Sequence, residues 1–109
     1  MTHIKLFWQN GHIVQVDASG HSGFAPEGED IVCAAVSSLV QGAFVGLRKV
    51  ANLAPVFRKS EAFFSFCLPQ TDMHSRYVSD IILETMRCSL KDIAKEHISY
   101  VKVEDILNV

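Results

Sequence analysis

Residues 4–18 are IKLFWQNGHIVQVDA, two short runs of β-type residues on either side of the pair Asn10-Gly11. An Asn-Gly pair between two such runs is typical of a two-residue hairpin turn, because both residues tolerate positive φ angles. We therefore predict strands at residues 4–8 and 13–18, joined across residues 9–12. This hairpin supplies the first two strands of a sheet on which later elements can pack.

A loop and a long helix follow the hairpin. Residues 19–29 include three glycines, which favours a loop. Residues 30–52 are mostly apolar and predict a helix, with Asn52 and the following Pro55 as the signals that end it.

One stripe of this helix carries only small side chains. Ser38, Gly42 and Gly46 follow one another at intervals of four residues, so they share a face. Each glycine costs a helix about 1 kcal/mol relative to alanine, so we expect close packing to compensate. We favour packing of this stripe on the sheet over a helix–helix dimer contact.

The second half of the chain predicts two strands, a second long helix and a last strand. Residues 56–58 and 62–68 are rich in β-type residues, with a polar turn at 59–61. We predict the last strand at residues 100–104. Thr71-Asp72 caps the second helix, whose apolar residues recur at helical spacing: Met73, Tyr77, Val78, Ile81, Met86, Leu90, Ile93 and Ala94.

The predicted element order is ββαββαβ, without an internal repeat or a low-complexity linker. We therefore expect residues 1–109 to form a single domain of the α+β class. Its architecture should be a two-layer α/β sandwich, with one mainly antiparallel or mixed sheet covered by two long helices. Such a fold does not by itself identify a function.

Composition narrows the class of protein. The chain is 49% hydrophobic and 20% charged, with a formal net charge of −2. That balance is ordinary for a compact domain and lacks the basic excess that nucleic-acid binding favours. We therefore expect no direct nucleic-acid partner.

The cysteines and the apolar helix indicate the cellular location of the protein. Cys33, Cys67 and Cys88 form no CxxC pair, and no secretory signal precedes the first strand, which favours free thiols in a reducing cytoplasm. Residues 31–47 approach the length of a membrane span, but Asp30 precedes them and basic residues follow. A core helix explains them better, so we expect no membrane partner.

The segment from Gly20 to Ser37 contains the candidate catalytic residues. It is a glycine-rich loop with a histidine that leads into a helix with a cysteine in its first turn. The N–H groups and dipole at a helix N-terminus favour a sulfur anion, which can lower a thiol pKa from about 8.5 towards roughly 3.5–7.5. His21 could accept the proton of Cys33. The pattern predicts a cysteine hydrolase.

The same segment resembles a known family. The matching residues are Gly20-His21, Gly23, Ala25, Gly28 and Asp30-Ile31-Val32-Cys33-Ala34-Ala35-Val36-Ser37. Together with length and element order, they resemble the signature of the ribosomal-processing cysteine protease family, Prp. The resemblance implies a bacterial cytoplasmic endopeptidase that removes an N-terminal extension from a large-subunit ribosomal protein. It also implies that the cleaved bond follows a pair of aromatic residues and that the protein forms a homodimer.

Carried over residue by residue, the resemblance makes Cys33 the nucleophile and His21 the general base and later acid. Backbone N–H groups at the start of the helix would stabilise the oxyanion. Gly20, Gly23 and Gly28 are candidate hinges of the loop at residues 19–29, and we expect substrate binding to order this loop over the dyad. Ser22 stands where alanine is common in the family.

Two residues of the segment have alternative roles. Asp30 could orient His21 as a third catalytic group, but three residues before Cys33 it is well placed to cap the helix, and we favour the cap. Ser37 follows Cys33 by one turn, and it either lines the site or bonds a backbone carbonyl within the helix. We rank these two roles equally.

Other candidate residues have simpler interpretations. We expect Cys67 and Cys88 to pack in the core as small apolar residues. His3, His12, His74 and His97 are expected to be solvated, and so are Glu27 and Glu29, although the two carboxylates could attract a basic substrate. Phe63 and Phe64 should point to opposite faces of a strand, so that one of them could meet substrate.

Three classes of function stay open at this stage. The first is the specific cysteine endopeptidase, which needs no cofactor. The alternative is a non-catalytic ribosome-associated interaction or assembly module in which Cys33 is buried. A metal protein using His21 and Cys33 is the weakest, because a structural zinc site needs further ligands at recognisable spacing.

Overall fold

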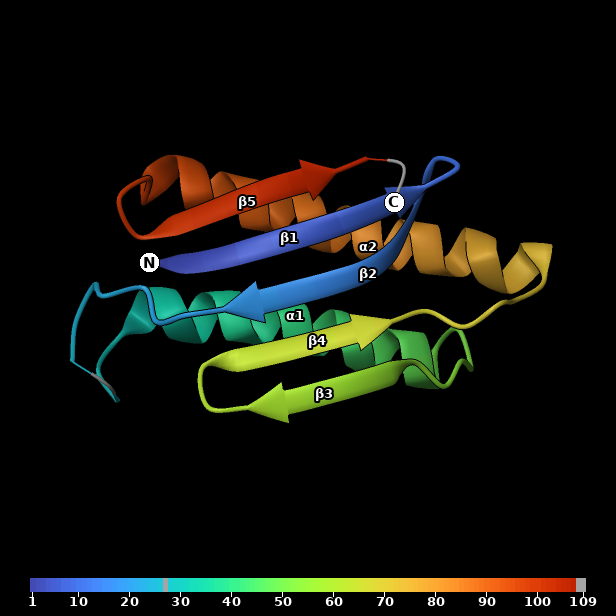
Figure 1. The fold of residues 1–109 in the computed structure, drawn as a ribbon, viewed down its shortest axis with the longest axis horizontal. Coiled ribbons are helices and arrows are strands. Elements are labelled where there is room, and N and C mark those ends of the chain that lie inside the picture. The colour runs from blue at the N-terminus through green and yellow to red at the C-terminus, as the bar shows by residue number, and fades with distance from the viewer. Residues whose placement is uncertain (27, 108–109) are drawn as a thin grey trace.

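The fold has five strands and two helices in the predicted order. The computed structural model describes residues 1–26 and 28–107. Its elements are β1 (Thr2–Gln9), β2 (His12–Ser19), α1 (Ile31–Lys49), β3 (Val56–Ser60), β4 (Phe63–Cys67), α2 (Met73–Glu96) and β5 (Val101–Ile106). The ββαββαβ order and the α+β class are thereby confirmed (Figure 1).

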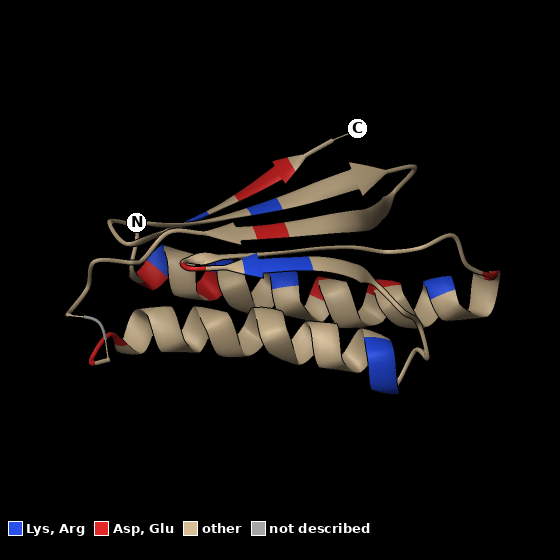
Figure 2. Ribbon diagram, turned by 60° about the horizontal axis from the view of Figure 1, so that its bottom comes forward, with Lys and Arg blue, Asp and Glu red and all other residues tan. Residues whose placement is uncertain are grey.

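The strands form one mixed sheet in the order β3-β4-β2-β1-β5. β1 pairs with β2, β2 with β4 and β4 with β3, all antiparallel, whereas β5 pairs with β1 in parallel. Figure 2 shows both helices beneath one face of this sheet, which gives the two layers expected from the sequence. In this order, the N-terminal strand β1 lies between β2 and the C-terminal strand β5.

The hairpin turn forms where the Asn-Gly pair predicts it. Asn10 and Gly11 both have positive φ, 52° and 81°, as a two-residue hairpin turn with the twist of its strands requires. β1 and β2 then pair from Gln9 and His12 outward, with one irregularity between Phe7 and Trp8.

Two predicted boundaries were wrong by a few residues. α1 ends at Lys49 rather than near Asn52, because the N–H groups of Val50 and Ala51 both bind the Gly46 carbonyl, at 2.8 and 3.0 Å. Asn52 follows with a φ of 55°, which takes the chain out of the helix.

The β3–β4 connection is also shorter than expected. β3 continues to Ser60, so the turn consists of Glu61 and Ala62 instead of residues 59–61. Ala62 has a φ of 54°, an unfavourable value for alanine that sequence pattern does not indicate.

One apolar cluster fills the space between the layers. It combines buried residues of α1 and α2 with the helix-facing residues of the sheet: Ile4, Leu6, Ile13, Val16, Val32, Val36, Val40, Ala43, Phe44, Leu47, Phe66, Leu83, Met86, Leu90 and Val101. Each fully buried large side chain contributes roughly 1.5–3 kcal/mol. By length and composition, α1 is apolar enough to cross a membrane. In this fold, part of its apolar surface packs in the cluster.

Some residues of the predicted helical patterns do not pack between the helices and the sheet. Met73, Tyr77 and Ile81 of α2 are exposed, because the first turns of this long helix leave their apolar side chains outside the core. Gly46 faces the Ile82 side chain, and Gly42 and Gly46 line a groove between the two helices. The prediction that the small stripe packs on the sheet was therefore wrong.

A charged cluster ties β5 to α2 and β1. Asp105 accepts hydrogen bonds from the Arg87 guanidinium at 2.9 and 3.0 Å, from Lys91 at 2.9 Å and from the Trp8 indole at 2.9 Å. The bonds from Arg87 are the main cause that holds the pKa of Asp105 far below its usual range. This carboxylate fixes the outer edge of the sheet on the helix layer.

Candidate active site

Asp30 caps α1. Its Oδ1 accepts the N–H of Cys33 at 2.8 Å, and its backbone is extended, as an N-cap requires. Cys33 is therefore the third residue of the helix, in the first turn, where N–H groups and the helix dipole favour negative charge.

The second carboxylate oxygen of Asp30 is also occupied. The Ser22 hydroxyl donates to Asp30 Oδ2, and the Ser22 Oγ accepts the N–H of Phe24 at 3.2 Å. The bond from Ser22 is the main cause that lowers the pKa of Asp30. Within the described residues, no hydrogen bond joins Asp30 to His21, so the geometry is that of the cap we favoured.

His21 is exposed and follows a tightly held glycine. The Gly20 N–H binds the Ala62 carbonyl at 2.8 Å, and the Gly20 carbonyl accepts the Thr2 hydroxyl at 3.3 Å. Gly20 has a φ of 84°, and a Cβ there would lie 2.5 Å from the Met1 carbonyl oxygen. Only glycine fits this position, which sets where the His21 loop leaves β2.

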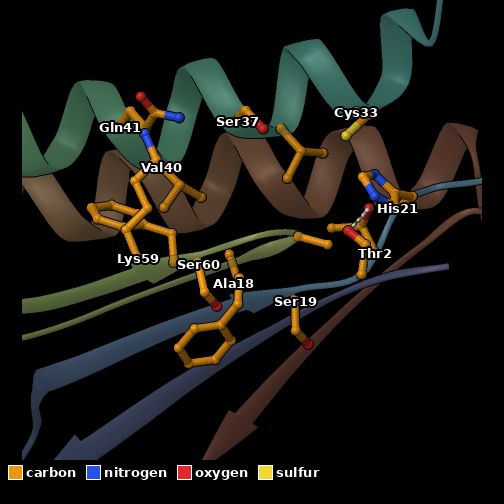
Figure 3. A pocket seen from close by; sticks show the side chains of 15 residues that line it. Thr2, Ala18, Ser19, His21, Cys33, Ser37, Val40, Gln41, Lys59 and Ser60 are labelled. Atoms are coloured by element: carbon orange, nitrogen blue, oxygen red, sulfur yellow. Dashed lines mark hydrogen bonds between the residues drawn. The ribbon is translucent and has the colours of Figure 1, made fainter. Parts of the chain in front are cut away.

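The candidate nucleophile Cys33 and the candidate base His21 border the same two cavities. A cavity of about 210 Å³ is bordered by His21, Cys33 and Ser37. A second, of about 450 Å³, is bordered by the same three residues and by Gly23 and Gly28. Figure 3 shows Cys33 and His21 at one end of the first cavity, with Ser37 one turn further along α1. Among the described residues, no hydrogen bond joins His21 to Cys33.

The first cavity extends from Cys33 along α1. Cys33, Ser37 and Gln41 form one row in Figure 3, and Lys59 rises from β3 towards Gln41. Eight helical residues span about 12 Å, which matches three to four residues of an extended peptide. The row therefore has the length of a short peptide segment.

The walls of this cavity are mainly apolar. Val36 and Val40 of α1 and Phe64 of β4 border it. Phe63 also borders the cavity, but its ring centroid lies 5.8 Å from the Arg58 guanidinium, whereas the Phe64 ring packs on Phe44 of α1 with the centroids 5.3 Å apart. The two rings therefore point to opposite faces of β4, as expected. An apolar slot beside a thiol can hold an apolar side chain of a peptide next to the bond that reacts.

Ser37 borders both cavities, so it lines the site. Gly23 and Gly28 have φ angles of 76° and 90°, and a Cβ at either would meet open space. Glu29 is exposed, as expected, whereas Glu27 lies outside the described residues. The loop glycines therefore differ: Gly20 is held by neighbours, and the other two are not.

Several residues predicted to be passive have different surroundings. Cys88 is exposed rather than in the core, and Cys67 is half-buried, because neither faces the cluster between the layers. His3 lies 3.0 Å from Glu104, and His12 lies 2.8 Å from Asp80, so neither is simply solvated. These partners are 101 and 68 residues away in sequence, which is why no local pattern indicates them.

Phe24 is a contact residue that sequence reasoning missed. Its ring packs edge-on against His97 and Tyr100, with centroids 5.7 and 5.4 Å away. These residues lie at the junction of α2 and β5, so the His21 loop is attached to the far end of the chain. Only the folded arrangement brings them together.

In the part of the chain that the structure describes, no group of three or more His, Cys, Asp or Glu residues is placed to hold a metal ion. Cys33 and His21 thus have no further metal ligands among these residues. The arrangement fits covalent chemistry of a thiol with a neighbouring base.

Comparison with known proteins gives consistent matches. The family model described as cysteine protease Prp matches residues 1–102 of this chain. A Bacillus subtilis protein named ribosomal processing cysteine protease Prp is 31% identical over 88 residues, covering 78% of this chain and 79% of that protein.

Two solved structures of an essential ribosomal processing protease Prp from S. aureus share the fold. The complex with a covalently linked product peptide has a TM-score of 0.87 at 22% identity, covering 96% of this chain and 99% of that chain. The complex with a substrate peptide has a TM-score of 0.81 at 20% identity, over 96% and 99% of the two chains.

Proposed function

Because this chain belongs to the cysteine protease Prp family, we propose that it removes the N-terminal extension of a large-subunit ribosomal protein. The name of the B. subtilis relative supports a role in ribosomal processing. The observation that carries the proposal is the position of Cys33 in the first turn of α1, bordering the same two cavities as His21.

The first half of the reaction forms an acyl-enzyme. His21 takes the proton of the Cys33 thiol, and the thiolate attacks the scissile carbonyl carbon. N–H groups of the first turn of α1 stabilise the oxyanion. The Cys33 N–H already binds Asp30, so this role falls to other N–H groups of that turn. The C–N bond then breaks, and His21 gives its proton to the leaving amine.

The second half releases the new carboxyl end. His21 takes a proton from water, and the hydroxide attacks the thioester carbonyl. The C–S bond breaks, and the Cys33 sulfur recovers a proton from His21. No metal or cofactor takes part in this cycle.

The first cavity supports the expected cleavage site. The family resemblance implies cleavage after two aromatic residues, and Val36, Val40 and Phe64 provide apolar contact for such rings. The segment before the scissile bond would then lie along α1 towards Gln41.

Substrate binding would also order the loop at residues 19–29. Gly23 and Gly28 have the free space and positive φ angles expected of hinges, whereas Gly20 is a fixed pivot. Amide hydrogen exchange in this loop should slow when an uncleavable peptide binds. Unchanged exchange would exclude the closure.

The proposal includes a homodimer in the cytoplasm. Exposed Ile81 and Val50 border a groove of about 400 Å³ between the helices, which offers apolar surface to a second copy. Light scattering across a range of protein concentrations tests this part, and a monomer mass throughout would exclude it.

The test of the function itself uses the extended ribosomal protein of the same organism. It is incubated with wild type, Cys33→Ala and His21→Ala, and intact masses are measured. We expect one truncation, produced by wild type alone. An intact partner bound equally by all three proteins would instead indicate a non-catalytic ribosome-associated module.

A further inference from the structure

We propose that Ser22 is a positioning residue for peptide cleavage, because its hydroxyl links the backbone beside His21 to the cap of the Cys33 helix. The inference rests on the proposed function, since it assigns a role within the same site. It is specific to this chain, because relatives with alanine at this position lack the hydroxyl and must hold the loop by other contacts. Ser22 does not touch the reacting atoms and acts through His21.

Ser22 is an anchor within an exposed loop. It is 2% exposed, whereas its neighbours His21 and Gly23 are both exposed. A buried hydroxyl needs partners, and this one has two, because it donates to Asp30 and accepts the N–H of Phe24. The burial therefore serves a defined set of hydrogen bonds.

These bonds join the two halves of the site. Ser22 binds one oxygen of Asp30, and the other oxygen binds the N–H of Cys33 at 2.8 Å. Since Ser22 follows His21 directly, a single carboxylate connects the backbone next to the base with the backbone of the nucleophile. A charge-assisted bond of this kind is about twice as strong as a neutral one.

The other neighbour of His21 does not make this connection. Gly20 is held by Ala62 and Thr2, which belong to the β3–β4 turn and to β1. That anchor fixes the loop to the sheet but not to α1. Ser22 thus supplies the described hydrogen bonds that set His21 relative to Cys33.

The chain contains a matched control for this bond. Ser65 on β4 is 3% exposed, and its hydroxyl donates to the Asp17 carboxylate on β2 at 2.5 Å. Neither Ser65 nor Asp17 borders the two cavities at Cys33. Ser65→Ala therefore removes the same type of buried hydrogen bond away from the dyad.

The first test compares the cleavage kinetics of Ser22→Ala and Ser65→Ala on the extended ribosomal protein. Misplacement of a catalytic group by about 1 Å can cost on the order of 100-fold in rate. We expect Ser22→Ala to lower kcat by about 10-fold to 100-fold with KM within about twofold, because ground-state binding is kept. Ser65→Ala should lower the melting temperature and leave kcat within about twofold. Equal kcat values for Ser22→Ala and wild type would overturn the proposal.

The second test shows whether Ser22 acts through His21. The alkylation rate of Cys33 by iodoacetamide near pH 7 is measured for wild type, Ser22→Ala, His21→Ala and the double variant. We expect Ser22→Ala to slow alkylation at least about fivefold when His21 is present. In the His21→Ala background the same substitution should slow alkylation less than about twofold, because the effects of coupled residues are not additive. Equal slowing in both backgrounds would show a structural role only and overturn the proposal.

The two tests separate this proposal from the proposed function. If wild type cleaves the ribosomal protein and Ser22→Ala cleaves it equally well, only the role of Ser22 fails. If wild type leaves it intact and His21→Ala does not change Cys33 alkylation, the protease function fails and the role of Ser22 with it.

Discussion

The two helices begin with the same local chemistry, and only one of them begins a site. Asp30 caps α1 by accepting the N–H of Cys33, and Asp72 caps α2 by accepting the N–H of Ser75, both at 2.8 Å. In each case the third helical residue carries a nucleophilic side chain.

The surroundings of the two N-termini differ. At α1, the loop with His21 and buried Ser22 covers the start of the helix, and two cavities meet at Cys33. At α2, Asp72 and His74 are exposed, and Met73 is 90% exposed. A capped nucleophile is therefore not sufficient, and the enclosing loop turns this helix start into a candidate active site.

The largest expected difference between the two regions is in catalysis. Cys33→Ala and His21→Ala should each lower cleavage of the ribosomal protein by on the order of 10⁴-fold or more, because each removes a reacting group. Ser75→Ala and His74→Ala should leave the rate unchanged. Intact-mass time courses measure this, and a loss of similar size in either α2 variant would contradict the distinction.

The next effect concerns how the loop leaves the sheet. Gly20→Ala should destabilise the fold by about 1–3 kcal/mol, since the residue has a positive φ and its Cβ would clash with the Met1 carbonyl. Gly23→Ala has similar backbone strain but open space, so it should cost less. Urea denaturation gives both values, and equal losses would show that the contact with Met1 is not what fixes Gly20.

Removal of the two caps separates stability from activity. Asp30→Ala and Asp72→Ala should each lower Tm by about 4–8 °C, because a helix loses its N-cap in both. Only Asp30→Ala should also lower kcat, to about the level of Ser22→Ala, since it breaks the same link. A near-total loss of turnover at native Tm would instead make Asp30 a catalytic group.

The smallest effect is the pH dependence of the caps. Hydrogen bonds lower the pKa of both carboxyl groups, with Ser22 the main cause for Asp30 and the Ser75 N–H for Asp72. A lowered folded-state pKa stabilises the fold above the unfolded value of about 3.9, and this contribution is lost as pH falls below it. The Tm difference between wild type and either Asp→Ala variant should therefore shrink from pH 5 to pH 2. A constant difference would show that ionisation of the caps does not matter.

Local features of the sequence predicted much of this structure. The Asn10-Gly11 hairpin, the Asp30 cap and the element order follow from turn, cap and periodicity rules that depend on near neighbours. The pairing of His21 with Cys33 could be proposed because only twelve residues separate them.

Tertiary contacts set the limits of that reasoning. The parallel pairing of β5 with β1, the contact of Phe24 with Tyr100 and the proximity of His12 to Asp80 join distant parts of the chain. The exposure of Cys88 likewise depends on which face of α2 meets the sheet. No local pattern fixes these arrangements.

The central claim, that the setting of the α1 N-terminus activates Cys33, is tested most directly by competitive alkylation. Wild-type protein is treated with limiting iodoacetamide at pH 7, and peptide masses give the relative rates at Cys33, Cys67 and Cys88. The account predicts that Cys33 reacts much faster than exposed Cys88, and that His21→Ala removes most of the difference. If Cys88 reacts as fast as or faster than Cys33, the site is not an activated thiol and the account is wrong.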